Sequence, residues 1–125
     1  MARILAVDDD PDMLGLLGDV LRVGGHQVIT ADSGPAATAA LASDGPVELI
    51  VSDVSMPGMS GLELLVLLRQ RPGLERLPAI FVTALPLSGV LKVDLQLGVL
   101  YLNKPFDASA LLDAVDKSLE IGHVW

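Results

Sequence analysis

The chain has 125 residues, about the length of one domain, and its 51% hydrophobic content is enough for one compact core. A formal charge of −8 argues against a surface for the phosphate backbone of nucleic acids, which requires clustered Lys and Arg. The chain has no cysteine, and the first residues, which soon reach three aspartates, lead us to expect neither a signal peptide nor a membrane-spanning stretch. We therefore expect a single cytoplasmic domain over residues 1–125, without disulfides or membrane contact.

The first half of the chain alternates short apolar runs with helix-start signals. Asp10 followed by Pro11 is typical of a helix N-terminus, because aspartate caps the first turn and proline fits the first helical position. Gly24 ends the apolar stripe that follows, and Ser33 precedes an alanine-rich helix. The expected elements are strands at 4–7, 27–31 and 47–53 and helices at 11–23 and 33–42.

The second half continues this alternation. Ser60 and Glu63 match the capping box, in which each side chain hydrogen-bonds the backbone of the other residue. Residues 85–97 are leucine-rich and long enough for a helix, although Pro86 and Gly89 stand near its start. Asp107 caps a last helix. The expected elements are helices at 60–70 and 85–97, strands at 79–83 and 100–103, and a final helix from 107 to a short tail at 121–125.

Five strands that alternate with five helices predict an α/β domain. Right-handed crossovers join such units into a doubly wound parallel sheet. In the flavodoxin-like strand order 2-1-3-4-5, the first and third strands are neighbours, and ligands bind beyond their carboxyl ends.

Polar residues end the apolar runs at this edge of the predicted sheet. Asp8 and Asp9 follow the first strand and Asp53 ends the third, so we expect the three carboxylates to converge. Such a cluster is unfavourable without a cation, and oxygen ligands without His or Cys select Mg²⁺ or Mn²⁺. The metal invites a phosphoryl group, and Asp53 is the candidate acceptor because a carboxylate can form an aspartyl phosphate.

Two further strand-end residues are expected to serve the same phosphoryl group. Lys104 would neutralise charge on the transferring oxygens, and Thr83 would donate a hydrogen bond to the product. Taken one by one, Asp8 and Asp9 are capping or solvated residues, Thr83 is an ordinary strand residue and Lys104 an ordinary surface lysine. Their joint placement at strand ends favours the functional interpretation, whereas Asp10 keeps its capping role.

Four motifs carry a resemblance to a known family and together cover essentially the whole chain. They are VDDD at 7–10, SDVSMPGMSG at 52–61, FVTA at 81–84 and YLNKPF at 101–106. In this order they resemble the receiver domain of two-component response regulators, in particular the chemotaxis regulators. The resemblance implies that Asp53 is the phosphoacceptor, that Asp8 and Asp9 hold Mg²⁺ with the backbone carbonyl of Ser55, and that Lys104 binds the phosphate.

The same resemblance implies the moving parts of a switch. Thr83 would be the switch hydroxyl and Tyr101 the switch aromatic, although Tyr101 is equally interpreted as a core residue with a solvated hydroxyl. Lys104 and Pro105 would be joined by the cis peptide bond of the family.

The predicted function is a phosphorylation-dependent signalling switch. A histidine kinase or histidine phosphotransfer protein would donate the phosphoryl group to Asp53, and the added charge would change the partner-binding surface. The chain would be a regulatory domain and not an enzyme, catalysing only its own phosphoryl transfer and slow autodephosphorylation.

Two other classes of function are open to the same residues. A Mg²⁺-dependent phosphohydrolase would need a second acid near Asp53, where Val54 and Ser55 stand. A purely structural partner-binding module would not need the charged residues, all of which are present.

The segment from 84 to 101 departs most from the family. It holds more leucine than one buried stripe can cover, so we expect the face of the fourth helix and fifth strand to bind an effector or a second copy of the chain. The resemblance implies that Leu85, two residues after Thr83, lies over the phosphoryl group. A leucine there offers no hydrogen bond to orient an attacking water, which predicts slow hydrolysis of the aspartyl phosphate.

Overall fold

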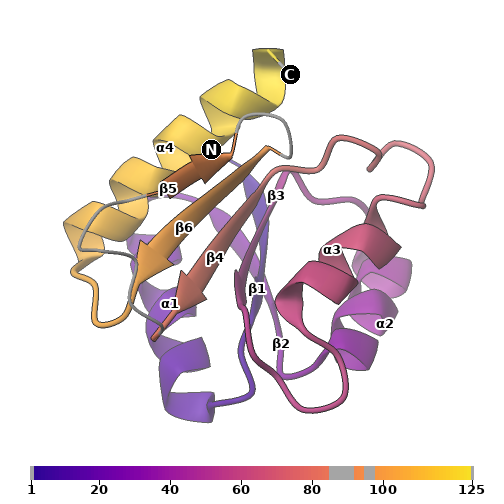
Figure 1. Ribbon diagram of the computed structural model, residues 1–125, viewed down its shortest axis with the longest axis horizontal. Coiled ribbons are helices and arrows are strands. Elements are labelled where there is room, and N and C mark those ends of the chain that lie inside the picture. Colours follow the sequence, from indigo (N-terminus) through magenta and orange to yellow (C-terminus); the bar gives the residue numbers. More distant parts are fainter. Residues whose placement is uncertain (1, 85–91, 95–97, 125) are drawn as a thin grey trace.

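A computed structural model describes residues 2–84, 92–94 and 98–124 as strands and helices around one sheet (Figure 1). The strands are β1 (Arg3–Val7), β2 (Gln27–Ala31), β3 (Leu49–Asp53), β4 (Ala79–Thr83), β5 (Lys92–Asp94) and β6 (Val99–Asn103). The helices are α1 (Pro11–Val23), α2 (Gly34–Asp44), α3 (Gly61–Leu68) and α4 (Ala108–Val124).

The sheet has the order β2-β1-β3-β4-β6-β5, and its first five strands are parallel. β6 is the fifth parallel strand, so the predicted flavodoxin-like order 2-1-3-4-5 is confirmed. β5 adds an antiparallel strand at the edge beside β6. Helices α1 and α4 cover one face of the sheet, and α2 and α3 cover the other (Figure 1). None of the described helices combines the length and the apolar character that crossing a bilayer requires.

Side chains of the central strands alternate between two buried clusters, as the period of a strand requires. Leu5, Ile50 and Phe81 belong to the cluster that includes the buried side chains of α2 and α3. Val51 and Val82 belong to the cluster that includes those of α1 and α4. Each of these central strands is therefore covered on both faces, which explains why its sequence is largely apolar until its carboxyl end.

Predicted caps fix where the helices begin. The capping bonds run from the amides of Asp12, Ala36, Glu63 and Ala110 to the side chains of Asp10, Ser33, Ser60 and Asp107, over 3.0, 3.1, 3.1 and 2.7 Å. The Glu63 carboxylate also accepts from the Ser60 amide at 3.0 Å, which completes the predicted capping box.

The predicted helix over 85–97 is wrong at residues 92–94, which form β5, so four of the five predicted helices are found among the described residues. The β-branched Val93 lies opposite Leu100 across the antiparallel pair, an arrangement that a helix would not allow. The other residues of this predicted helix lie outside the described part of the chain. The same is true of Leu85 and of most of the expected association surface.

Two helix ends also differ from prediction. The predicted tail at 121–125 is wrong at 121–124, because α4 continues to Val124. No proline interrupts this stretch, and extending an existing helix adds a hydrogen bond for each residue fixed. In contrast, α3 ends at Leu68, two residues before the predicted end, where the amide of Gln70 turns back to the Leu67 carbonyl at 3.2 Å.

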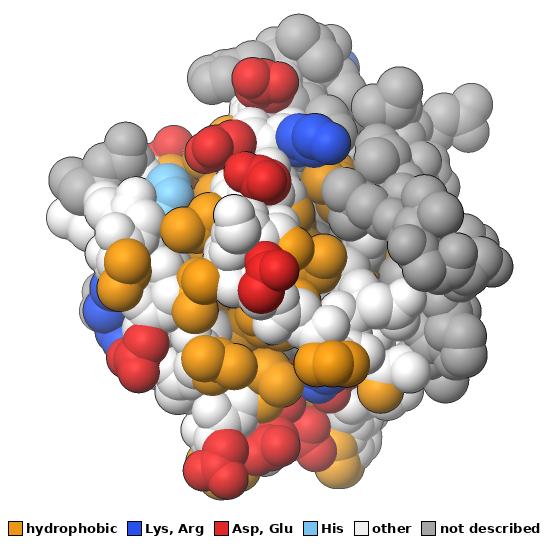
Figure 2. Space-filling model, turned by 90° about the vertical axis from the view of Figure 1, so that its left-hand side faces the viewer, with side chains coloured by type: hydrophobic (Ala, Val, Ile, Leu, Met, Phe, Trp, Pro, Cys, Tyr) orange, Lys and Arg blue, Asp and Glu red, His pale blue; other side chains and the backbone are white. Residues whose placement is uncertain are grey.

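The face covered by α1 and α4 is acidic and apolar (Figure 2). Acidic side chains gather toward the top and the bottom of this view, and hydrophobic side chains with a few acidic ones among them lie between. Leu16 and Val23 are the exposed large hydrophobics of α1, with 47% and 84% of their surface accessible.

Candidate functional site

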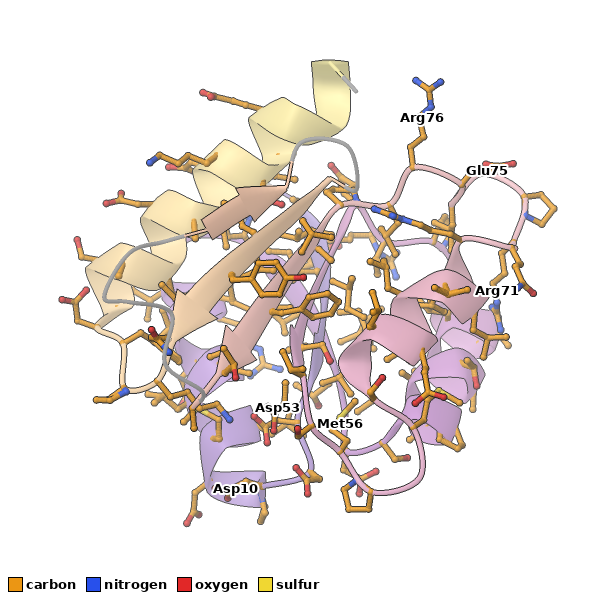
Figure 3. The ribbon with its side chains drawn as sticks, in the orientation of Figure 1. Asp10, Asp53, Met56, Arg71, Glu75 and Arg76 are labelled. Carbon is orange, nitrogen blue, oxygen red and sulfur yellow. The ribbon has the colours of Figure 1, made fainter. Side chains whose placement is uncertain are left out.

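Three carboxylates meet at the carboxyl end of the sheet, as the sequence predicted. One carboxylate oxygen from each of Asp8, Asp9 and Asp53 lies within 4.8 Å of the others. Asp8 follows β1 and Asp53 ends β3, and these two strands are paired neighbours. Figure 3 shows Asp53 at the lower end of the sheet, between the start of α1, marked by Asp10, and the loop that carries Met56.

Lys104 reaches this cluster from the end of β6. Its ammonium nitrogen lies 3.2 Å from Asp8 Oδ2 and 3.5 Å from Asp53 Oδ2. The alternation of side chains along a strand explains why these three residues lie together. Asp8, Asp53 and Lys104 each follow by two positions a residue that faces α1 and α4, so their side chains lie on that same face. One ammonium faces three carboxylates, so the cluster keeps a net negative charge.

Asp8 is the most constrained member of the cluster, since its side chain is wholly buried. Burial raises the pKa of the Asp8 carboxyl, and the negative charge of Asp53 adds to this effect. The Asp10 amide, which donates to Asp8 at 2.9 Å, and Lys104 oppose it without cancelling it. A buried, incompletely compensated carboxylate beside two others is an oxygen donor set that fits a hard divalent cation such as Mg²⁺ or Mn²⁺.

The backbone of Asp53 is held by contacts that the sequence analysis did not identify. The Ser52 hydroxyl donates to the Asp53 carbonyl at 2.9 Å, and the Gly61 amide donates to the Val54 carbonyl at 2.9 Å. A methyl group at Gly61 would collide with the Asp53 carbonyl oxygen. A polar Ser52 inside an otherwise apolar strand and a glycine at the first position of α3 were the signals available in the sequence.

Thr83 is the last residue of β4, the strand paired with the one that Asp53 ends. Asp53 is paired with Val82, so Thr83 lies one residue further toward the carboxyl edge, and it is buried. Its carbonyl accepts hydrogen bonds from the Lys104 amide at 2.7 Å and from the Asn103 side chain at 3.2 Å. The peptide bond between Lys104 and its following proline is cis, as the resemblance implied.

Tyr101 is not a member of the acidic cluster. It is partly buried and packs against the cluster under α2 and α3, with its ring centroid 5.7 Å from that of Phe81. Ser55 is exposed in the loop after β3, and the role of its carbonyl as a metal ligand stays a prediction.

The chain belongs to the response regulator receiver domain family, which it matches over residues 4–116. It is therefore a receiver domain of two-component systems, a class of regulatory domain that works as a phosphorylation-dependent switch. This confirms the family and the class of function predicted from the sequence motifs.

Individual relatives agree with this assignment. The chain is 41% identical over 115 residues to the response regulator protein FleR of Pseudomonas aeruginosa, covering 91% of this chain and 24% of that protein. It is 36% identical over 120 residues to the chemotaxis protein CheY of the same organism, covering 94% and 96% of the two chains. The chain thus spans about a quarter of FleR but nearly all of CheY.

Solved structures show the same fold. The chemotaxis response regulator CheY4 of Vibrio cholerae superposes with a TM-score of 0.77 at 29% identity, covering 94% of this chain and 98% of that one. The response regulator TrrA of Thermotoga maritima, solved in complex with Mg²⁺ and BeF, gives a TM-score of 0.76 at 32% identity, with coverages of 94% and 99%.

Proposed function

We propose that residues 1–125 form a single receiver domain in which Asp53 accepts a phosphoryl group from a phosphohistidine. The donor is a histidine kinase or a histidine phosphotransfer protein. A bond from the Asp53 carboxylate oxygen to phosphorus forms while the phosphorus–nitrogen bond breaks, and the departing imidazole keeps the electron pair and takes up a proton. The observation that carries this proposal is the convergence of Asp8, Asp9 and Asp53 with one lysine at the carboxyl edge.

Asp8, Asp9 and Asp53 would hold Mg²⁺ or Mn²⁺, and the Ser55 carbonyl is the further ligand proposed from the resemblance. A bound divalent ion supplies positive charge next to the phosphoryl oxygens. The buried Asp8 supports this assignment most strongly, because its carboxylate has no access to water that could stabilise its charge. In this proposal Asp8 and Asp9 are metal ligands only. Asp53, which alone lies at the end of the central strand β3, is also the phosphoryl acceptor.

Lys104 supplies the second positive charge of the site. Its ammonium already lies 3.5 Å from the acceptor carboxylate, so it can stabilise the phosphoryl oxygens without a large movement. The Thr83 carbonyl accepts a hydrogen bond from the Lys104 amide, which ties the end of β4 to the lysine. We propose that Thr83 and Tyr101 respond to the phosphorylated state and that a partner protein reads the change.

The domain acts on itself and has no other substrate in this proposal. It catalyses its own phosphoryl transfer and a slow autodephosphorylation, and its output is binding. The regulatory character of the family supports this assignment.

Incubation with acetyl phosphate and Mg²⁺, followed by intact mass measurement, tests the proposal. The wild type is expected to gain the mass of one phosphoryl group, and Asp53→Asn is expected to gain none, because an amide is not a phosphoryl acceptor. Asp113→Asn, which removes an exposed carboxylate of α4, is the matched control and should be modified like the wild type. Equal modification of Asp53→Asn would overturn the assignment.

The metal requirement has its own test. Asp9→Ala is expected to lose both Mg²⁺ binding and modification, since two carboxylates and a lysine hold a divalent ion less well than three carboxylates do. Titration calorimetry with Mg²⁺ alone separates metal binding from phosphorylation. Undiminished modification in excess chelator would contradict the metal site.

A further inference from the structure

Three side chains form a row across the middle of the sheet on the face away from the carboxylates. Ser52 of β3 is paired with Phe81 of β4, which is paired in turn with Tyr101 of β6. Phe81 belongs to the cluster under α2 and α3, and Tyr101 packs against that cluster. The row therefore connects the strand of Asp53 with the proposed switch aromatic through a single ring.

The first end of this row touches the backbone that carries the acceptor. A methyl group built at Gly61 would lie 3.1 Å from Phe81 Cε1 and 3.1 Å from Ser52 Oγ, and it would collide with the Asp53 carbonyl. The Phe81 ring, the start of α3 and the peptide group after Asp53 are therefore packed together without spare space. A displacement of this backbone cannot occur unless the Phe81 ring moves with it or the packing opens.

The other end of the row touches Tyr101. The two rings are tilted by 47° with centroids 5.7 Å apart, within the range of attractive aromatic pairs. Phe81 is only 1% exposed, whereas Tyr101 is partly buried at the border of the cluster. The two rings thus differ in freedom, because the first is enclosed on all sides and the second has an open side.

We propose that Phe81 is a positioning residue that couples the backbone at Asp53 to the side chain of Tyr101. The proposal rests on the proposed function, since the change it transmits is the phosphorylation of Asp53. Charge added to the carboxylate alters the end of β3 and its junction with Gly61, the enclosed Phe81 ring follows, and Tyr101 responds at the open side. This route runs on the opposite face from the metal site and does not pass through Thr83.

The composition of the chain makes the route measurable. Tyr101 is the only tyrosine, and Phe81 and Phe106 are the only phenylalanines. Ring-labelled tyrosine gives one signal that reports Tyr101 directly by NMR. Phe106 packs against the other buried cluster, under α1 and α4, so Phe106→Leu is a matched control for Phe81→Leu.

The experiment adds Mg²⁺ and beryllofluoride, the combination bound in the Thermotoga maritima structure, to the wild type and to both variants. Fluorine NMR of the bound beryllofluoride measures ligand binding, and the Tyr101 ring signal measures the response. The wild type and Phe106→Leu are expected to show the same shift of Tyr101. Phe81→Leu is expected to bind beryllofluoride with a similar affinity but to lower the Tyr101 shift about threefold or more.

A full Tyr101 shift in Phe81→Leu would overturn the coupling while leaving the proposed function intact. Absence of bound beryllofluoride in the wild type would instead overturn the proposed function, and the coupling with it. A loss of binding and of shift in equal proportion would also contradict the proposal, because it would mean that Phe81 only supports the fold of the site.

A measurement on the unchanged protein guards against misfolding of the variant. With ring-labelled phenylalanine, beryllofluoride should move the Phe81 signal together with that of Tyr101 over the same titration. A Phe81 signal that stays fixed while Tyr101 moves would overturn the proposal without any substitution. Phe81→Met, which keeps an apolar side chain of similar reach but removes the ring, should reproduce the loss seen in Phe81→Leu.

Discussion

The two faces of the central strands differ at the carboxyl edge of the sheet. On the face toward α1 and α4, the strand ends carry charged side chains, and Lys104 forms ion pairs with Asp8 and Asp53. On the face toward α2 and α3, the side chains near the strand ends are closely packed. Ser52 and Phe81 lie there, next to the backbone of Asp53 and the start of α3.

The comparison shows how one strand can serve chemistry and coupling at once. The side chain of Asp53 belongs to the charged face, and its carbonyl is held from the packed face by the Ser52 hydroxyl. A change of charge at the Asp53 carboxylate therefore acts on a backbone segment that can shift only if the side chains packed against it shift too. Substitutions confined to one face should separate the two roles.

Removing Lys104 should have the largest effect on the rate of modification, because the substitution removes the only ammonium group that forms ion pairs with Asp8 and Asp53 among the described residues and leaves the packed face unchanged. Lys104→Ala is expected to slow modification by acetyl phosphate about 10²-fold, the loss typical of removing one positioned donor from a developing anion. The free energy of unfolding should fall by only about 1–2 kcal/mol, since removing the cation leaves Asp8 less compensated. Rates from intact mass and stability from urea unfolding distinguish the two effects, and a collapse of the unmodified fold would point to a structural lysine.

Adding one methyl group at Gly61 should break the junction between the faces. Gly61→Ala forces the new carbon into the Asp53 carbonyl, and overpacking of this kind destabilises a protein by about 1–3 kcal/mol. Both the unfolding midpoint and the rate of modification are expected to fall. Gly15→Ala is the control, because a methyl group there meets no atom within 4 Å. Unchanged modification in a destabilised Gly61→Ala would show that the junction does not position the acceptor.

Asp8→Asn should sharpen the comparison through pH. Burial raises the folded-state pKa of Asp8, so the charge of Asp8 destabilises the metal-free fold fully above that pKa. The penalty shrinks as pH falls below the folded-state pKa, and it is gone below the ordinary pKa of an aspartate. The variant is therefore expected to be more stable than the metal-free wild type at neutral pH, on the order of 1 kcal/mol, with the difference vanishing in acid. Saturating Mg²⁺ should stabilise the wild type only. A variant less stable at pH 7 without metal would contradict this account.

The smallest effect is expected away from the edge. The Ser118 hydroxyl of α4 is fully buried and has no hydrogen-bond partner among the described residues. Ser118→Ala should therefore change stability by less than about 1 kcal/mol, toward stabilisation, and leave modification by acetyl phosphate unchanged. Thermal unfolding measures the stability, and intact mass measures the modification. Slower modification of Ser118→Ala would show that this part of α4 influences the acceptor site, contrary to the contacts described above.

The parts predicted correctly from the sequence depend on local patterns. Asp10 and Ser60 cap their helices by accepting hydrogen bonds from the amides of residues two and three positions away. Their role can therefore be predicted from the neighbouring residues in the sequence. The meeting of Asp8, Asp53 and Lys104 followed from strand order, because the carboxyl ends of parallel strands share one edge.

The parts that were missed depend on partners distant in the chain. Val93 was assigned to a helix from its leucine-rich surroundings, and only its pairing with β6 makes it a strand residue. Ser52 and Phe81 look like ordinary strand residues, and their packing against Gly61 is visible only once α3 is docked on the sheet. Local propensity records neither contact, since both are set by tertiary structure.

The central claim is that Asp53 is the acceptor whose modification both faces are built around. Reduction of the phosphorylated protein with borohydride converts an aspartyl phosphate into homoserine, and peptide mass spectrometry then locates it. We predict homoserine at position 53 alone, formed only when Mg²⁺ was present during phosphorylation. Homoserine at position 8 or 9, or at position 53 after phosphorylation in excess chelator, would contradict the account.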